Sequence, residues 1–141
     1  MMKKTLRNMM IVIVLLVFAF TLVSCGAGIK AADAKDLINE FFNAVVEEDY
    51  QKAKTLLHPE CSADIENFFL QVEKEKSVDF QRGITIDRYT GFSTSLYDSS
   101  VGGSRYELTM KTTVDGKSAE FTIEIIKNEA GYGIYHIGLK I

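Results

Sequence analysis

The feature that most constrains this chain is an alternation of apolar and polar side chains near its C-terminus, interrupted by Asp115-Gly116. Asp-Gly between two alternating segments is the strongest short-range signal for a β-hairpin with a two-residue turn. Such a turn fixes the register of the two strands, so that apolar side chains face apolar side chains. The expected cross-strand pairs are Tyr106 with Ile125, Leu108 with Ile123, Met110 with Phe121, and Thr112 with Ala119. On the other face, Lys111 is expected opposite Glu120, which is a favourable pair.

A second turn, Glu129-Ala130-Gly131, predicts that a third strand joins this hairpin. A three-residue loop with a left-handed glycine again brings apolar side chains opposite one another. The expected pairs are Tyr135 with Ile125, Ile137 with Ile123, Leu139 with Phe121, and Ile141 with Ala119. The preceding stretch, Val78–Ser99, is expected to add one or two strands, connected through Val101-Gly102-Gly103.

Before the sheet, apolar side chains recur at helical spacing, which predicts three amphipathic helices. Asp33 is expected to cap a helix that runs to about Glu48, and Asp49 a short one that ends at His58-Pro59. Ser62 is expected to cap the third helix. Helices followed by an antiparallel sheet with one apolar face predict an α+β fold in which the helices cover that face.

The first 25 residues predict an export signal. Three basic side chains come first, then the apolar run Met9–Val23, which is interrupted only by Thr21, and then Ser24-Cys25-Gly26. A basic, an apolar and a small-residue zone in this order are typical of a secretory signal peptide. An uncleaved transmembrane helix is the alternative, but an apolar run of this length forms only about 22 Å of helix. The hydrocarbon core of a bilayer is ~30 Å thick.

Leu22-Val23-Ser24-Cys25 resembles the lipobox of bacterial lipoproteins. The resemblance implies cleavage before Cys25 and a diacylglyceryl thioether on its sulfur. Two acyl chains hold a protein stably on a membrane, whereas one does so only marginally. Residues 1–24 would then be the signal peptide, residues 25–32 a lipidated tether, and residues 33–141 one domain on the extracytoplasmic face of the cell membrane.

Cysteine count and charge exclude further classes of protein. The chain has two cysteines, so lipidation of Cys25 leaves Cys61 without a partner for an intramolecular disulfide. The signal contains three of the 16 Lys and Arg residues and none of the 19 Asp and Glu residues. The rest of the chain therefore has a net negative charge. An acidic domain without a basic stripe is a poor candidate for binding nucleic acid.

The helical part also resembles the opening of nuclear-transport-factor-two-like domains. The resemblance rests on Glu40-Phe41-Phe42-Asn43-Ala44, on Glu48-Asp49-Tyr50, and on Leu56-Leu57-His58-Pro59-Glu60. It implies a cystatin-like roll over residues 33–141, in which a curved sheet wraps around a long helix and encloses a conical cavity. Similar domains occur in many small exported bacterial lipoproteins, and a shared fold does not imply a shared function.

Two groups of residues are candidates for reactive chemistry. His58 lies three residues before Cys61, which is expected near a helix N-terminus where a thiolate is favoured. A half-buried structural cysteine is the alternative. His136 is expected opposite Glu124, which in turn faces Glu107, on the outer face of the sheet. This trio could hold a metal, although three polar side chains on a solvated face are also what strand alternation produces.

The inner face of the sheet offers contacts for a ligand rather than a catalytic set. Its candidate cavity contacts are Tyr106, Tyr135, Met110 and Thr112. No carboxylate is clearly expected there, and the sequence predicts no catalytic residue, metal or cofactor. We therefore expect a non-catalytic module that binds a protein or a small apolar ligand. An isomerase-like or hydrolytic enzyme, or a structural subunit of an envelope assembly, is the alternative.

Overall fold

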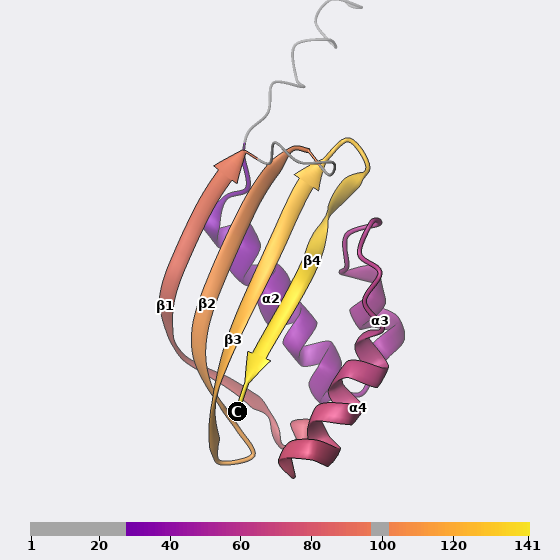
Figure 1. The fold of residues 1–141 in the computed structure, drawn as a ribbon, viewed down its shortest axis with the longest axis vertical. Helices are drawn as coiled ribbons and strands as arrows, with labels where there is room; N and C mark the ends of the chain where they lie inside the picture. The colour runs from indigo at the N-terminus through magenta and orange to yellow at the C-terminus, as the bar shows by residue number, and fades with distance from the viewer. Residues whose placement is uncertain (1–27, 97–101) are drawn as a thin grey trace, which may run out of the picture.

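The computed structural model describes residues 28–96 and 102–141. The helices come first, namely α2 (Ala31–Val46), α3 (Tyr50–Thr55), α4 (Ile65–Lys76) and the short 3-10 helix η1 (Phe80–Arg82). The strands β1 (Ile84–Leu96), β2 (Ser104–Val114), β3 (Lys117–Asn128) and β4 (Gly131–Lys140) follow. They form a curved antiparallel sheet in the order β1-β2-β3-β4, with α2 crossing behind it (Figure 1). The α+β fold is confirmed, whereas the signal and Cys25 lie outside the described residues.

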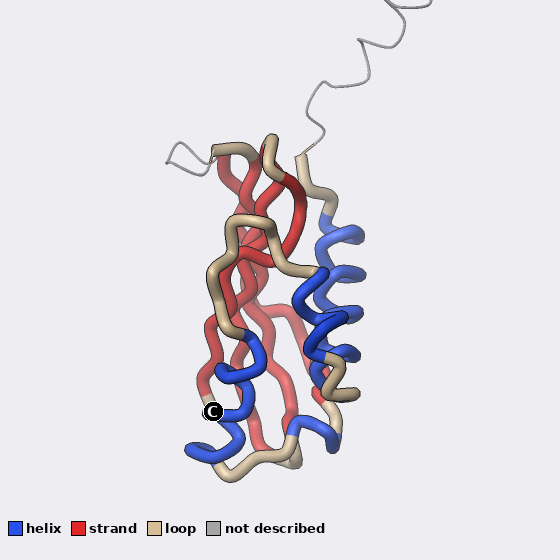
Figure 2. The backbone as a smooth tube through the Cα atoms, turned by 90° about the vertical axis from the view of Figure 1, so that its right-hand side faces the viewer, coloured by secondary structure: helices blue, strands red, loops and turns tan. Residues whose placement is uncertain are grey.

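A chain of aromatic rings joins the helices to the sheet. Seen from the side in Figure 2, α2 lies along one face of the sheet. Phe42 of α2 packs against Phe121 of β3 with ring centroids 4.8 Å apart. Phe41 meets Phe69 of α4, which meets Phe80 of η1 edge-on. All five rings are buried, so the apolar helix faces and the apolar sheet face form a single core.

The helix caps differ in part from the sequence prediction. Asp49 caps α3 as expected, its side chain accepting a hydrogen bond from the backbone of Lys52. Asp33 is not a cap, because helix-favouring alanines start α2 at Ala31 and leave Asp33 in the first turn. Asp64, rather than Ser62, caps α4.

The end of α3 was also predicted too late. The helix ends at Thr55, and the next residues turn to pair with the edge of the sheet. Leu56 O accepts a hydrogen bond from the Ile134 backbone, and His58 donates one to Ile134 O. Leu57 therefore forms a parallel bridge with β4, which extends the sheet beyond its last strand.

The β2–β3 hairpin has the predicted register. The pairs run from Tyr106 with Ile125 to Thr112 with Ala119, and Lys111 lies opposite Glu120. Asp115 and Gly116 both have positive φ, at 47° and 73°, as a two-residue turn of this hairpin type requires. The two turn residues alone were therefore enough to predict the register of β2 and β3.

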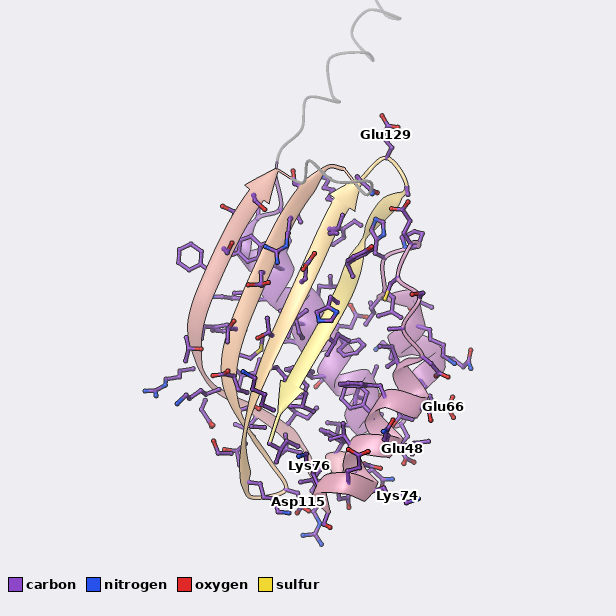
Figure 3. The ribbon with its side chains drawn as sticks, in the orientation of Figure 1. Glu48, Glu66, Lys74, Lys76, Asp115 and Glu129 are labelled. Carbon is purple, nitrogen blue, oxygen red and sulfur yellow. The ribbon has the colours of Figure 1, made fainter. Side chains whose placement is uncertain are left out.

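The β3–β4 hairpin corrects one expected pair. Ile123 lies opposite Ile137 and Phe121 opposite Leu139 as expected, but Ile125 lies opposite Ile134 and not Tyr135. The extra residue sits in a bulge beside Tyr135, and the turn itself is shorter than expected, with Asn128 paired to Gly131. The turn residue Glu129 projects from the upper end of the molecule (Figure 3).

The stretch expected to form one or two strands forms η1 and one long strand, β1. Its pairing with β2 shifts twice, between Ile86 and Arg88 and between Tyr89 and Gly91. Bulges change which face a side chain occupies and increase the local twist. They explain why alternation in this stretch did not yield a register. Val101 of the expected connection lies outside the described residues.

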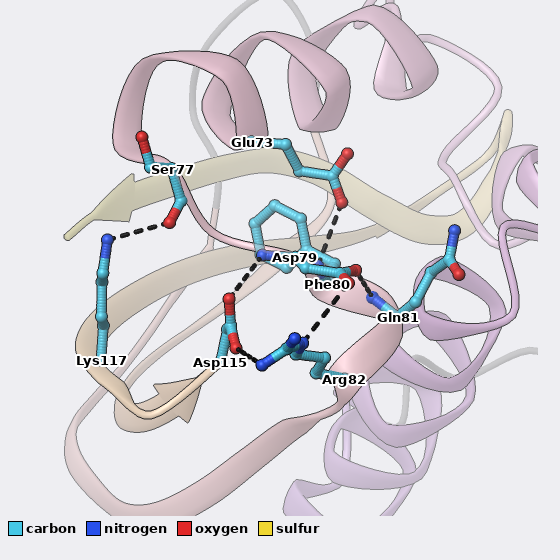
Figure 4. Close-up of polar contacts among 8 residues, drawn as sticks. All are labelled: Glu73, Ser77, Asp79, Phe80, Gln81, Arg82, Asp115 and Lys117. Carbon is cyan, nitrogen blue, oxygen red and sulfur yellow. Dashed lines mark hydrogen bonds and ion pairs between the residues drawn. The ribbon is translucent and has the colours of Figure 1, made fainter.

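Charged side chains join the lower end of the sheet to the helices (Figure 4). Asp115, in the β2–β3 turn, accepts hydrogen bonds from the backbone of Asp79 at 3.2 Å and from Arg82 Nη1 at 3.0 Å. Lys117 Nζ donates to Ser77 O at 2.9 Å, just beyond the end of α4. The turn that sets the strand register thus also anchors the segment that leads from the helices into the sheet.

Candidate functional site

Two adjacent hollows lie where the first turn of α2 faces the end of β1 and the start of β2. One has a volume of about 480 Å³ and includes Ala31, Lys35, Tyr89, Phe92, Tyr106 and Leu108 in its walls. The other, of about 430 Å³, includes Gly28, Ile29, Thr94 and Tyr106. Tyr106 is common to both. Volumes of this size are typical of sites for small organic ligands.

The walls of the larger hollow are mainly aromatic and aliphatic, with one charged group. Phe92 pairs with Leu108 across the strands and is 77% exposed. Lys35 Nζ lies 4.5 Å above the centre of the Tyr89 ring, a cation–π contact. Burial raises the pKa of Tyr89, and the charge of Asp36 raises it further, so its hydroxyl stays protonated at neutral pH.

The four sequence-predicted cavity residues do not act as one group. Tyr106 lines both hollows. Met110 and Thr112 lie deeper, with no exposed surface, and the Thr112 hydroxyl donates to Ala119 O at 3.3 Å. Tyr135 belongs to neither hollow, because the bulge directs its ring against His58 with centroids 5.9 Å apart.

His58 has a structural environment. Its Nδ1 accepts the backbone N–H of Glu60 at 3.1 Å, so the proton of the neutral ring is on Nε2, 2.9 Å from Asn128 Oδ1. Asn128 Oδ1 also accepts backbone N–H groups of the β3–β4 turn. The ring nitrogens of His58 bond Asn128 and Glu60, not the half-buried Cys61 thiol, although the Cys61 backbone N–H donates to His58 O. This arrangement ties the loop to the turn and does not resemble a nucleophile with its base.

On the outer face, the expected trio is reorganised by a residue that the sequence analysis did not consider. Glu124 lies opposite both Glu107 and His136, as predicted. Arg105 Nη2 bonds both carboxylates, reaching Glu124 Oε2 at 3.0 Å. Glu124 is only 8% exposed, whereas His136 is exposed. Within residues 28–96 and 102–141, no group of three His, Cys, Asp or Glu side chains could hold a metal ion.

The wall residues Lys35, Tyr89 and Phe92 were missed by sequence reasoning. None of them stands out in the sequence, because a lysine on a helix and aromatic residues on an edge strand are common in proteins. Two register shifts in β1 precede Phe92, and such shifts change the face that a side chain occupies. The one sequence signal for this site was Phe92, an apolar residue in the segment Gly-Phe-Ser-Thr that has no apolar neighbours at strand spacing.

Compared with known proteins, the chain matches no family model, no curated protein and no solved structure. No helix among the described residues is long and apolar enough to cross a membrane.

Proposed function

We propose that this chain is an exported lipoprotein, anchored by a lipid on Cys25, whose domain binds a small apolar ligand without transforming it. The single observation that carries the binding proposal is the hollow lined by Tyr89, Tyr106 and the exposed Phe92. A ligand seated there would cover the Phe92 ring and the apolar wall formed by Tyr106 and Leu108. The lipobox-like Leu22-Val23-Ser24-Cys25 supports the anchor.

A cystatin-like roll is the fold that we propose for residues 33–141. In support, the long helix α2 packs across a curved antiparallel meander, and residues of both line the larger hollow. In the superfamily that the chain resembles, members that catalyse proton transfer use a carboxylic acid and a tyrosine inside the cavity. The described wall residues of the two hollows include Lys35, Arg105, tyrosines, serines and threonines, and no Asp or Glu. This set favours binding over catalysis.

The anchor is tested by replacing Cys25 with serine. The proposed glyceride is attached to the Cys25 sulfur. The C25S variant should therefore lack the mass of the lipid and keep its signal peptide. Metabolic labelling with a fatty acid and intact-protein mass spectrometry would measure both effects. A C61S variant is the matched control and should be labelled like the wild type. An unmodified thiol on Cys25 of the wild-type protein would refute the anchor.

The binding site is tested with an environment-sensitive apolar fluorophore, for which the absence of tryptophan in this chain gives a low background. Phe92→Ser should weaken binding about tenfold, because it removes part of the apolar contact area of one aromatic side chain. Leu70→Ser is the control, since Leu70 is another exposed apolar residue, on α4 and outside both hollows. Equal loss of affinity in the two variants would show nonspecific surface binding.

A further inference from the structure

Lys35 differs from two other helix lysines in having no acidic partner among the described residues. Lys52 lies 3.7 Å from Glu40, and Lys54 lies 3.6 Å from Glu66. The ammonium group of Lys35 instead lies over the Tyr89 ring, in the wall of the larger hollow. A cation–π contact leaves its N–H donors able to bind an anion, because the ring attracts the charge without accepting all of these hydrogens.

The rest of the hollow suits a hydrocarbon chain. Phe92, Tyr106 and Leu108 provide apolar surface, and Lys35 belongs to the same wall. The second hollow shares Tyr106 with the first and includes Ile29, whereas Thr94, Ser95, Ser104 and Arg105 make most of its wall polar. A flexible chain that lies along Phe92, Tyr106 and Leu108 would bury apolar area, and buried apolar area drives such binding.

We infer that the site takes a single-chain amphiphile with an anionic head, of the fatty-acid class, its head bound by Lys35 and its chain lying along Phe92 and Tyr106. This inference rests on the proposed function and specifies its ligand. Asp36, which acts electrostatically on Tyr89, opposes the anion. The attraction between Lys35 and the anion must therefore exceed the repulsion from Asp36. An Asp36→Asn variant should bind the anion more tightly than the wild type.

The position of the hollows suggests how such a ligand would arrive. Gly28 lies in the wall of the smaller hollow and is three residues from Cys25. Three residues span at most about 11 Å. If Cys25 carries the lipid, the site opens close to the bilayer. An anionic amphiphile could then enter from the membrane or from solution, and the same head and chain would be recognised in either case.

The test uses the protein isolated from its host membrane and placed in phosphatidylcholine vesicles, with two photoreactive probes, a long-chain fatty acid and the uncharged alcohol of the same length. After illumination, labelling is measured on the tryptic peptide that begins at Tyr89 and ends at Arg105. The acid should label this peptide about three- to tenfold more than the alcohol, as expected for one partly exposed ion pair with a charge-assisted hydrogen bond. Lys35→Met should abolish the preference. Lys74→Met, at the lower end of α4 in Figure 3, should keep it.

The possible results distinguish a failure of the anionic-head inference from a failure of the proposed binding function. Equal labelling by acid and alcohol, or a preference that survives in Lys35→Met, would overturn the anionic head but leave an apolar site. Labelling of this peptide by neither probe would overturn the apolar site itself. A third probe, a photoreactive phospholipid built into the vesicles, distinguishes the sources. Labelling by this probe alone would overturn the single-chain ligand, whereas labelling by the fatty acid alone supports it and entry from solution.

Discussion

Replacing Gly133 with alanine is expected to destabilise the domain by about 2–3 kcal/mol, the usual cost of forcing extra atoms into a packed site. A Cβ at this position would lie 2.5 Å from His58 N and 2.7 Å from Leu57 O, and both are backbone atoms that cannot rotate away. The substitution would therefore push the segment after α3 off the edge of β4 and break the hydrogen bonds that it makes with Ile134. Urea unfolding of a soluble version that begins at Gly26, followed by circular dichroism, measures the change.

Gly138→Ala is the matched control in the same strand. Its Cβ would meet only Thr122, at an ordinary contact distance of 3.7 Å. This variant should lie within about 0.5 kcal/mol of the wild type, as surface substitutions without a special constraint do. If both alanine variants unfold at the same urea concentration, the contact between β4 and the segment after α3 does not stabilise the domain.

The registers of the two hairpins differ in how far the sequence could predict them. The β2–β3 register followed from Asp115-Gly116, because a two-residue turn leaves a single pairing of the neighbouring residues. The β4 register depended on a tertiary contact. The bulge beside Tyr135 occurs where Leu57 pairs with Ile134, and residues so far apart in sequence give no local signal of their contact.

The candidate site was less predictable than the fold for the same reason. Tyr106 could be placed on the inner face by alternation, and the structure places it in both hollows. Lys35 and Tyr89 meet only because α2 crosses the sheet at β1 and because two bulges alter the side-chain positions of that strand. Hydrophobic spacing determines the face of a helix, but it does not determine which strand that face will contact.

The outer-face cluster was predictable in principle. The hairpin register places Glu107 opposite Glu124, and two carboxylates facing each other need a cation nearby. Arg105 is two residues before Glu107, so alternation puts it on the same face. Reading the charges as well as the apolar positions of the two strands would have identified this arginine as the partner of both acids.

Arg105→Met is expected to destabilise the domain by about 2–4 kcal/mol. The side chain of Glu124 is 10% exposed, and one of its oxygens, Oε1, is buried with no hydrogen-bond partner among the described residues. Without the guanidinium group, this carboxylate and that of Glu107 would face each other without a cation. Removing one partner of a buried ion pair costs about 3–5 kcal/mol, and the partial exposure of Arg105 reduces that figure.

A double-mutant cycle gives this prediction its sharpest test. Arg105→Met combined with Glu124→Met removes both charges, and an apolar pair of similar length should recover at least half of the lost stability. Lys111→Met is the control, because Lys111 lies on the same face opposite Glu120 but is exposed, and its loss should cost less than about 1 kcal/mol. Urea unfolding of the four cycle members gives the coupling free energy. A coupling near zero would mean that Arg105 stabilises the sheet through its aliphatic stem and not through its charge.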